Sequence, residues 1–264
     1  MLRHIPLLLA ILAPHQATAA DCTREYLQAA VDSYVAAQKA GNASFAASAA
    51  STYTENFKKQ PQPILSKALK VDFTRSILDT TACATYTEVI VTDSSHPYVI
   101  GSQIHWAVPG GSGAAAAGTP TKIETLVSDK DDWFFNATAT LYYSSRENWD
   151  PIPEAQRDSR ATIKAAGDAY CDVFSDKSVK VPWGMPCQRL EGGTYFGRGL
   201  PTDTCNVGVP SGVALTNRRY VIDEVIGTVS IFLTFGGSLP DSHEFRVEKG
   251  KLRFVHTITV TGRN

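Results

Sequence analysis

The sequence runs through the same order of elements twice, and this repeat limits the fold more than any other feature. In each half, residues with helical spacing come first, a proline-containing segment follows, and strand-like segments complete the half. The helical spacing covers residues 21–41 in the first half and 161–174 in the second. Because helices precede antiparallel strands in both halves, the pattern predicts an α+β protein made of two similar units.

The expected strands define the boundaries of these units. They cover residues 85–92, 98–108, 122–128 and 133–143, and then 219–226, 228–235, 243–248 and 251–261. The turn at 248–250 predicts a hairpin between the last two strands. We therefore expect a first domain over residues 21–145 and a second over residues 161–264, joined by a turn-rich linker over residues 146–160.

Three shorter segments are interpreted as irregular. Pro182 and Pro186 predict loops after the second helix. Residues 109–118 consist almost entirely of glycine and alanine and predict a flexible connection between strands. A phosphate-binding loop would need a Lys-Ser/Thr pair at a helix start, which this segment lacks.

Residues 1–20 have the pattern of a secretory signal peptide. Arg3 lies near the start, an apolar run covers residues 7–13, and small residues follow at 17–19. A buried N-terminal strand is the alternative. We expect a secreted, extracellular protein, with glycosylation sequons at Asn42 and Asn136. The longest apolar runs fall short of the ~18 residues of a membrane span, so no membrane partner is expected.

The sequence contains five cysteines, an odd number for a secreted protein. Export favours disulfides, because the extracellular environment is oxidising. Cys187 and Cys205 flank a loop rich in glycine and proline, and we expect them to pair. Cys22 would anchor the first helix through a bond to Cys83. Two disulfides are therefore predicted.

Cys171 is then left as a free thiol. It lies within the second expected helix beside Tyr170, and we interpret it as buried and inert. A reactive nucleophile is the alternative. That role needs a lowered thiol pKa, whereas the negative charges of the neighbouring Asp168 and Asp172 would raise it.

Several motifs resemble a known family. The segment 240–248, followed by 250–256, is similar to secreted fungal proteins of the DUF8021 type, and the likeness extends to 187–193, 219–224 and 53–56. The order of elements resembles the NTF2-like superfamily, which includes SnoaL-like and ketosteroid-isomerase-like proteins. The resemblance implies two tandem NTF2-like cones, each with helices packed on a curved antiparallel sheet. Such cones host isomerases, cyclases, dehydratases and binding proteins, so the function must be argued from the site.

Composition and motifs exclude several function classes. The 25 Lys and Arg residues balance 26 Asp and Glu residues, which argues against a nucleic-acid partner. The sequence lacks HExxH, paired CxxC and His-x-His spacings, so neither a metal nor a cofactor is expected. It also lacks the Gly-x-Ser-x-Gly motif of many hydrolases. A small apolar molecule is the expected partner, and the tandem arrangement favours a monomer.

The last strand carries the first candidate catalytic residue. By strand alternation, His256 shares a face with Leu252, Phe254 and Ile258. A histidine in an apolar stripe can act as a general base or acid if a carboxylate lies beside it. The alternative is a core histidine that is bonded to the backbone.

Two adjacent carboxylates are the other catalytic candidates. Asp223 and Glu224 alternate along one strand, so one of them must point toward an apolar environment. Desolvation raises a carboxyl pKa and lets the group exchange protons near neutral pH. The alternative is a pair of carboxylates that are solvated or bound to Arg218 and Arg219.

Three further residues are expected to contact a ligand. Tyr220 and His243 would orient the substrate, and Glu191 would lie at the edge of the pocket. A structural role at the start of a strand is the alternative for His243, with Asp241 or Ser242 shaping a turn before it. For Glu191 the alternative is a role in stabilising a turn.

These residues lead to two hypotheses. The first is a secreted, cofactor-free isomerase, cyclase or dehydratase that acts on a small apolar natural product such as a polyketide, in fungal secondary metabolism. The second is a non-catalytic extracellular protein that binds a ligand or a partner.

Overall fold

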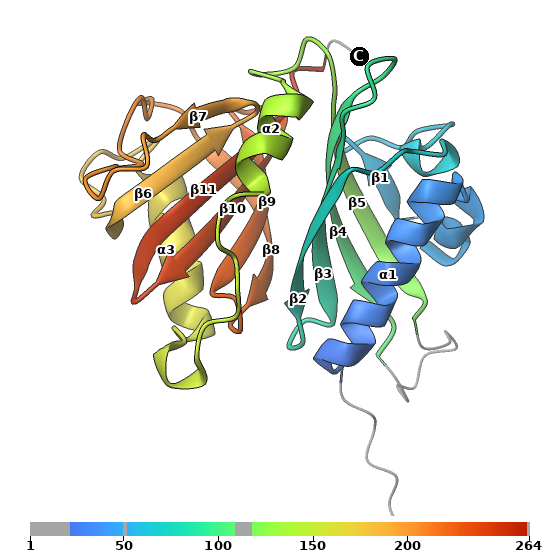
Figure 1. Cartoon of the computed structure of the whole chain (residues 1–264), viewed down its shortest axis with the longest axis horizontal. Helices are drawn as coiled ribbons and strands as arrows, with labels where there is room; N and C mark the ends of the chain where they lie inside the picture. Colours follow the sequence, from blue (N-terminus) through green and yellow to red (C-terminus); the bar gives the residue numbers. More distant parts are fainter. Residues whose placement is uncertain (1–21, 50–51, 109–117, 263–264) are drawn as a thin grey trace, which may run out of the picture.

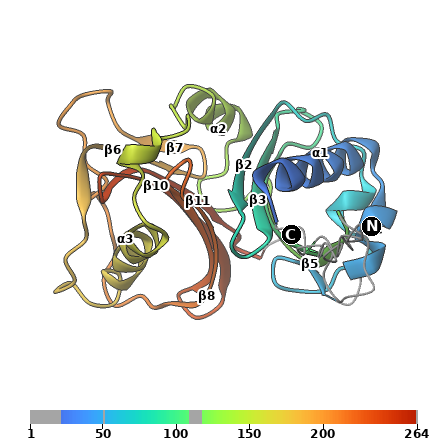
Figure 2. The same cartoon turned by 90° about the horizontal axis from the view of Figure 1, so that it is seen from below.

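The computed structural model describes residues 22–49, 52–108 and 118–262. Two sheets pack back to back, with a long helix on the outer face of each (Figures 1 and 2). The first sheet has five strands in the order β1-β5-β4-β3-β2, and the second has six in the order β7-β6-β11-β10-β9-β8. The α+β class is thus confirmed. The expected signal peptide at 1–20 and nearly all of the segment 109–118 lie outside the described residues.

The first sheet and its helices come from residues 24–128. In chain order the elements are α1 (Arg24–Ala40), η1 (Ala43–Ala49), β1 (Tyr53–Glu55), η2 (Ile64–Ser66), β2 (Phe73–Asp79), β3 (Ala84–Val91), β4 (Tyr98–Trp106) and β5 (Pro120–Ser128). Thr23 caps α1 by accepting a hydrogen bond from the Tyr26 backbone N–H. The helix ends at Gly41, which has a φ of 67°. A Cβ there would lie 2.6 Å from the Ala68 nitrogen, so only glycine fits.

The second sheet follows a short helical connection. Its elements are α2 (Ala137–Ser144), η3 (Glu154–Gln156), α3 (Arg160–Asp172), β6 (Trp183–Glu191), β7 (Thr194–Phe196), β8 (Leu215–Asp223), β9 (Thr228–Phe235), β10 (Leu239–Glu248) and β11 (Lys251–Thr259). The predicted hairpin at 248–250 joins β10 to β11, with Glu248 opposite Lys251. Most expected strands lie within a few residues of the predicted bounds.

Two local predictions are wrong. Residues 133–143 were expected as a strand because of their aromatic and β-branched side chains, but they contain α2. Asn136 starts this helix, since its side chain accepts a hydrogen bond from the Ala139 N–H at 3.0 Å. Pro186 lies inside β6 rather than in a loop. It falls where the β6–β11 register shifts between Leu252 and Phe254, so its missing N–H interrupts no regular ladder.

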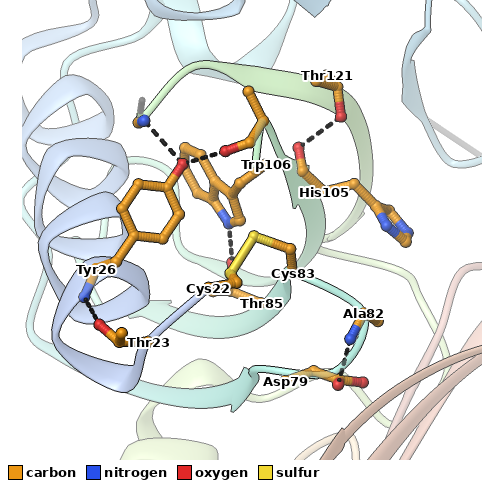
Figure 3. Close-up of a disulfide and its surroundings, with 12 residues drawn as sticks. Cys22, Thr23, Tyr26, Asp79, Ala82, Cys83, Thr85, His105, Trp106 and Thr121 are labelled. Carbon is orange, nitrogen blue, oxygen red and sulfur yellow. Dashed lines mark hydrogen bonds between the residues drawn. A yellow bond between two sulfur atoms is a disulfide. The ribbon is translucent and has the colours of Figure 1, made fainter. Parts of the chain in front are cut away.

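Both predicted disulfides are present. Cys22–Cys83 ties the start of α1 to the turn between β2 and β3 (Figure 3). Cys187–Cys205 closes the long excursion between β6 and β8. Cys171 is free and buried, and its burial raises the pKa of the thiol. Both sequon asparagines are exposed.

No helix within the described residues is long and apolar enough to cross a membrane.

Three apolar clusters hold the layers together. One lies between α1 and the first sheet, and a second between α3 and the second sheet. The third joins the sheets and includes Tyr86, Val221 and Phe232. Two ion pairs also connect the two halves, and in each an arginine from the helix of one half binds an aspartate from the sheet of the other. Arg24 of α1 pairs with Asp223 of β8, and Arg160 of α3 pairs with Asp79 of β2.

Candidate functional site

A cavity of about 330 Å³ lies on the α3 side of the second sheet. This volume is at the lower end of the range for small-molecule sites. The cavity is lined by Trp133, Tyr170, Phe174, Arg189, Glu191, Gly208, Pro210, Val213, Phe235, His243, Thr257 and Thr259. Most of the wall is therefore aromatic or aliphatic, with a few polar groups on the sheet.

Strand register brings these polar groups together. Thr257 of β11 lies opposite Glu191 of β6 on one side and opposite His243 of β10 on the other. Thr259 lies opposite Asp241 in the same way. Alternation keeps residues two apart on one face, so all five side chains share the α3 side of the sheet.

His243 and Asp241 form a buried pair at this cavity. His243 Nδ1 lies 3.0 Å from Asp241 Oδ2, and both side chains are almost fully buried. The Thr259 hydroxyl donates to the other carboxyl oxygen of Asp241 at 2.8 Å. His243 Nε2 has no hydrogen-bond partner among the described residues. His243 Nδ1 and Asp241 Oδ2 lie at ion-pair distance without forming a hydrogen bond. An imidazole with a carboxyl group beside one nitrogen and the other nitrogen unbonded can pass a proton to or from a ligand.

Arg189 forms a second polar group in the wall. Its Nη1 and Nη2 atoms donate to the backbone carbonyls of Cys205 and Val207, at 3.2 and 2.6 Å. These bonds hold the guanidinium against the loop that the Cys187–Cys205 disulfide anchors. Arg189 Nε lies 3.4 Å from Glu191 Oε2.

A residue from outside the second sheet closes part of the cavity. Trp133, which precedes α2, donates from Nε1 to Glu191 Oε1 at 2.7 Å. The connection is reinforced nearby, because Gly193 N–H donates to the Phe134 carbonyl and the Thr140 hydroxyl donates to the Gly192 carbonyl. The helical segment around α2 therefore docks on the β6–β7 turn.

Of the predicted ligand contacts, the cavity includes His243 and Glu191 but not Tyr220. The Tyr220 hydroxyl donates to Asp168 at 2.8 Å, and the Lys164 ammonium lies 4.1 Å from the centre of its ring. Tyr220 therefore belongs to a surface network with α3.

His256 lies on the opposite face of the sheet from the cavity. The β10–β11 pairing passes from Arg246–Phe254 to Val247–Leu252, which leaves Arg253 as an extra residue. Such a bulge reverses the alternation. Leu252 consequently packs toward α3, whereas Ile258 packs between the sheets. The predicted stripe of Leu252 with His256 is thus wrong.

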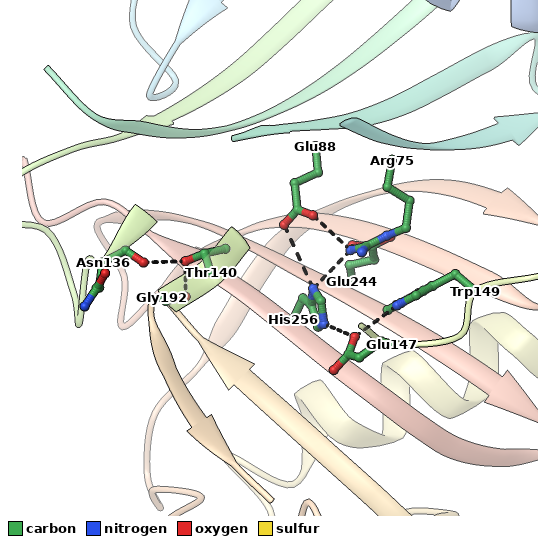
Figure 4. Close-up of polar contacts among 9 residues, drawn as sticks. All are labelled: Arg75, Glu88, Asn136, Thr140, Glu147, Trp149, Gly192, Glu244 and His256. Atoms are coloured by element: carbon green, nitrogen blue, oxygen red, sulfur yellow. Dashed lines mark hydrogen bonds and ion pairs between the residues drawn. The ribbon is translucent and has the colours of Figure 1, made fainter. Parts of the chain in front are cut away.

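His256 instead joins a buried charged cluster between the sheets (Figure 4). His256 Nε2 lies 2.6 Å from Glu147 Oε2. Arg75 Nη2 lies 2.7 Å from Glu244, 3.1 Å from Glu88 and 3.0 Å from His256 Nδ1. Trp149 covers the cluster, with its ring 4.0 Å from the Arg75 guanidinium. We call these six residues the interface cluster.

The charges of the interface cluster favour an imidazolium at His256. Burial lowers the pKa of His256, but Glu147 more than offsets this effect, and the pKa is raised to about 9. The close approach of Arg75 Nη2 to Nδ1 would suit a neutral ring nitrogen. The surrounding negative charge outweighs this contact, because with a neutral His256 the positive charge of Arg75 alone would balance the three buried carboxylates of the cluster.

Asp223 and Glu224 also lie away from the cavity. Asp223 is buried between the two sheets, where it pairs with Arg24 at 2.6 Å and accepts hydrogen bonds from the Leu78 and Val225 N–H groups. Glu224 is exposed and accepts from the Arg160 N–H at the start of α3. The structure therefore does not bring His256, Asp223 and Glu224 together.

One group of side chains has the composition of a metal site. Ligand atoms of Glu88, Glu244 and His256 lie within 4.8 Å of one another. The Arg75 guanidinium contacts all three, however, and so supplies the positive charge that a metal ion would bring. These residues fit an ion-pair network better than a metal centre.

The residues that sequence reasoning missed include Arg189 and Thr257 in the cavity wall and Asp241 beside His243. Asp241 was placed in a turn, but β10 already includes it. The alternating spacing Asp241-x-His243 was the available signal. No comparable signal marks Arg189, because β6 was not predicted.

Part of the chain matches a known protein family. Residues 156–259 match the family model described as a domain of unknown function, DUF8021. The match includes α3 and all six strands of the second sheet. No curated protein matches the chain.

Proposed function

We propose that the chain is a secreted NTF2-like protein that binds a small, largely apolar molecule, such as a polyketide natural product, in the cavity of its second domain. The observation that carries this proposal is the cavity of about 330 Å³, whose walls include Tyr170, Phe174 and Phe235. Apolar enclosure with a few fixed polar groups is typical of small-molecule sites.

We further propose that His243 and Asp241 give this site a cofactor-free proton-transfer activity. Isomerisation, cyclisation and dehydration all need a group that removes a proton from carbon or oxygen and returns it. Asp241 Oδ2 lies 3.0 Å from Nδ1 and would stabilise a protonated ring by its charge, while Nε2 forms no hydrogen bond with the described residues. This pair takes the place of His256, Asp223 and Glu224, which lack contact with the cavity.

The alternative function is non-catalytic binding. One observation favours it: the His243 ring packs against Tyr170, Phe174 and Phe245, with ring centres 5.5, 6.1 and 5.8 Å apart. A histidine with a purely structural role would pack against aromatic rings in the same way.

Hydrogen exchange on a ketone separates the two functions. The probe is 2-tetralone in D₂O, with deuterium incorporation beside the carbonyl followed by NMR. We expect wild-type protein to accelerate exchange over buffer, and His243→Gln and Asp241→Asn to lose at least a hundredfold of that acceleration. His96→Gln, at an exposed position, is the control. Saturable binding of 2-tetralone without accelerated exchange would favour the non-catalytic alternative.

Binding itself is tested by filling the cavity. Val213 lines it, so Val213→Phe is expected to weaken 2-tetralone binding at least tenfold. Val108→Phe makes the same change at an exposed position of the first domain and should leave binding unchanged. Equal binding by both variants would refute the assignment of the cavity.

A further inference from the structure

The cavity contains buried polar atoms that lack hydrogen-bond partners. Among the described residues, Arg189 Nε and Thr257 Oγ1 are buried and form no hydrogen bond. Arg189 is 3% exposed and Thr257 is 7% exposed, and both line the cavity. Buried polar groups are nearly always bonded in folded proteins. His243 Nδ1 and Asp241 Oδ2 are also unbonded, but they face each other at 3.0 Å, whereas Arg189 Nε and Thr257 Oγ1 call for another explanation.

The surrounding contacts fix these atoms in place. The other two nitrogens of Arg189 are held by the carbonyls of Cys205 and Val207, so the guanidinium cannot turn without breaking both bonds. Glu191 directs its Oε1 atom to Trp133, and its Oε2 atom lies 3.4 Å from Nε without forming a hydrogen bond. The free donors are thus preorganised rather than mobile.

The formal charges of the site limit what it can accept. Arg189 is balanced by Glu191, and Asp241 adds a further carboxyl group next to His243. An anionic ligand would bring another negative charge into a largely apolar enclosure, which is costly. An uncharged oxygen is the acceptor that fits.

The apolar wall limits the rest of the ligand. Aromatic rings of Trp133, Tyr170, Phe174 and Phe235 line the cavity, and they favour flat, ring-containing molecules. A volume of about 330 Å³ suits one or two fused rings.

We propose that the ligand is an uncharged aromatic molecule of one or two rings, whose hydroxyl or carbonyl oxygen accepts hydrogen bonds from Arg189 Nε and Thr257 Oγ1. This inference rests on the proposed function, because it assigns the chemistry of the same cavity.

Three probes of similar size test the ligand class: 2-naphthol, naphthalene and 2-naphthoate, titrated by calorimetry or by tryptophan fluorescence. We expect 2-naphthol to bind about tenfold more tightly than naphthalene, as one satisfied hydrogen bond allows. We expect 2-naphthoate to bind more weakly than 2-naphthol.

Variants at Thr257 test the residue assignment. Thr257→Val removes a hydroxyl that has no partner within the described residues, so the thermal midpoint should stay constant or rise. The preference for 2-naphthol over naphthalene should fall severalfold. Thr257→Ser keeps the hydroxyl and should keep the preference. Thr85→Val, in the first sheet, removes a buried hydroxyl that accepts a hydrogen bond from Trp106 Nε1, so it should lower the midpoint while the preference remains.

Each result has a defined meaning. Equal affinity for 2-naphthol and naphthalene, or an unchanged preference in Thr257→Val, would overturn the inference and leave the apolar site standing. Tightest binding by 2-naphthoate would overturn the uncharged ligand. Failure of all three probes to bind would overturn both the inference and the proposed function.

Discussion

Arg24 Nη1 lies 2.6 Å from Asp223 Oδ1, so α1 neutralises a carboxylate that is buried in the second sheet. Asp79 and Arg160 make the reverse connection at 2.7 Å. In each pair the Asp side chain is almost completely buried and the Arg is about one-third exposed. The two halves therefore depend on each other for charge balance.

The first prediction concerns this dependence. Arg24→Ala leaves Asp223 buried with only the Leu78 and Val225 N–H donors, and we expect a loss of about 1–3 kcal/mol in the free energy of unfolding. Chemical denaturation measures it. Lys39→Ala removes an exposed charge from the last turn of the same helix and should cost under about 0.5 kcal/mol. Equal effects of the two variants would contradict the role of the ion pair.

The second prediction concerns pH. His256 has its pKa raised from 6.5 to about 9, so folding favours the protonated ring. The resulting stabilisation is complete below about pH 6.5 and is lost as the pH rises through about 9. A shift of this size corresponds to about 3 kcal/mol. We expect the stability difference between wild type and His256→Gln to shrink between pH 6 and pH 10, and a constant difference would refute the charged state.

The third prediction concerns Cys171. Because the thiol is buried and its pKa is raised, native protein should not react with a thiol reagent at neutral pH. Unfolded, non-reduced protein should show one thiol per chain. Three or five thiols would contradict the observed pairing.

The fourth prediction compares the two disulfides. Cys22–Cys83 spans 61 residues of sequence and Cys187–Cys205 spans 18, and a longer loop loses more entropy on closure. By the chain-entropy model, replacing the pairs with serine costs about 4 and about 3 kcal/mol. Thermal or chemical denaturation of both double variants tests the order. A larger loss for the shorter loop would instead indicate a special role in holding the wall of the cavity.

Local patterns in the sequence predicted much of the second sheet. Strands β9 and β11 carry alternating or continuous apolar residues, and the 248–250 turn defines a hairpin. The face of the sheet on which each side chain lies was harder to predict. One extra residue, Arg253, reverses the alternation along β11 and so changes the face on which His256 lies. Nothing local marks a bulge in a strand of mixed side chains.

The candidate site was only partly predictable, for a different reason. His243 and Glu191 were predicted, but their partners depend on which strands lie side by side. Thr257 becomes relevant only because the parallel β6–β11 pairing places it between them. The interface cluster likewise joins residues 75 to 256, a separation that no periodicity can signal.

The contact between Trp133 and Glu191 has a consequence for how this architecture can be divided. A fragment that begins at residue 156 would include every strand of the second sheet. It would lose the indole that borders the cavity and the hydrogen bonds that Phe134 and Thr140 form with the β6–β7 turn. In recombination or domain grafting, the transferable module is thus longer than the sheet. It begins before Trp133, within sequence that precedes α2.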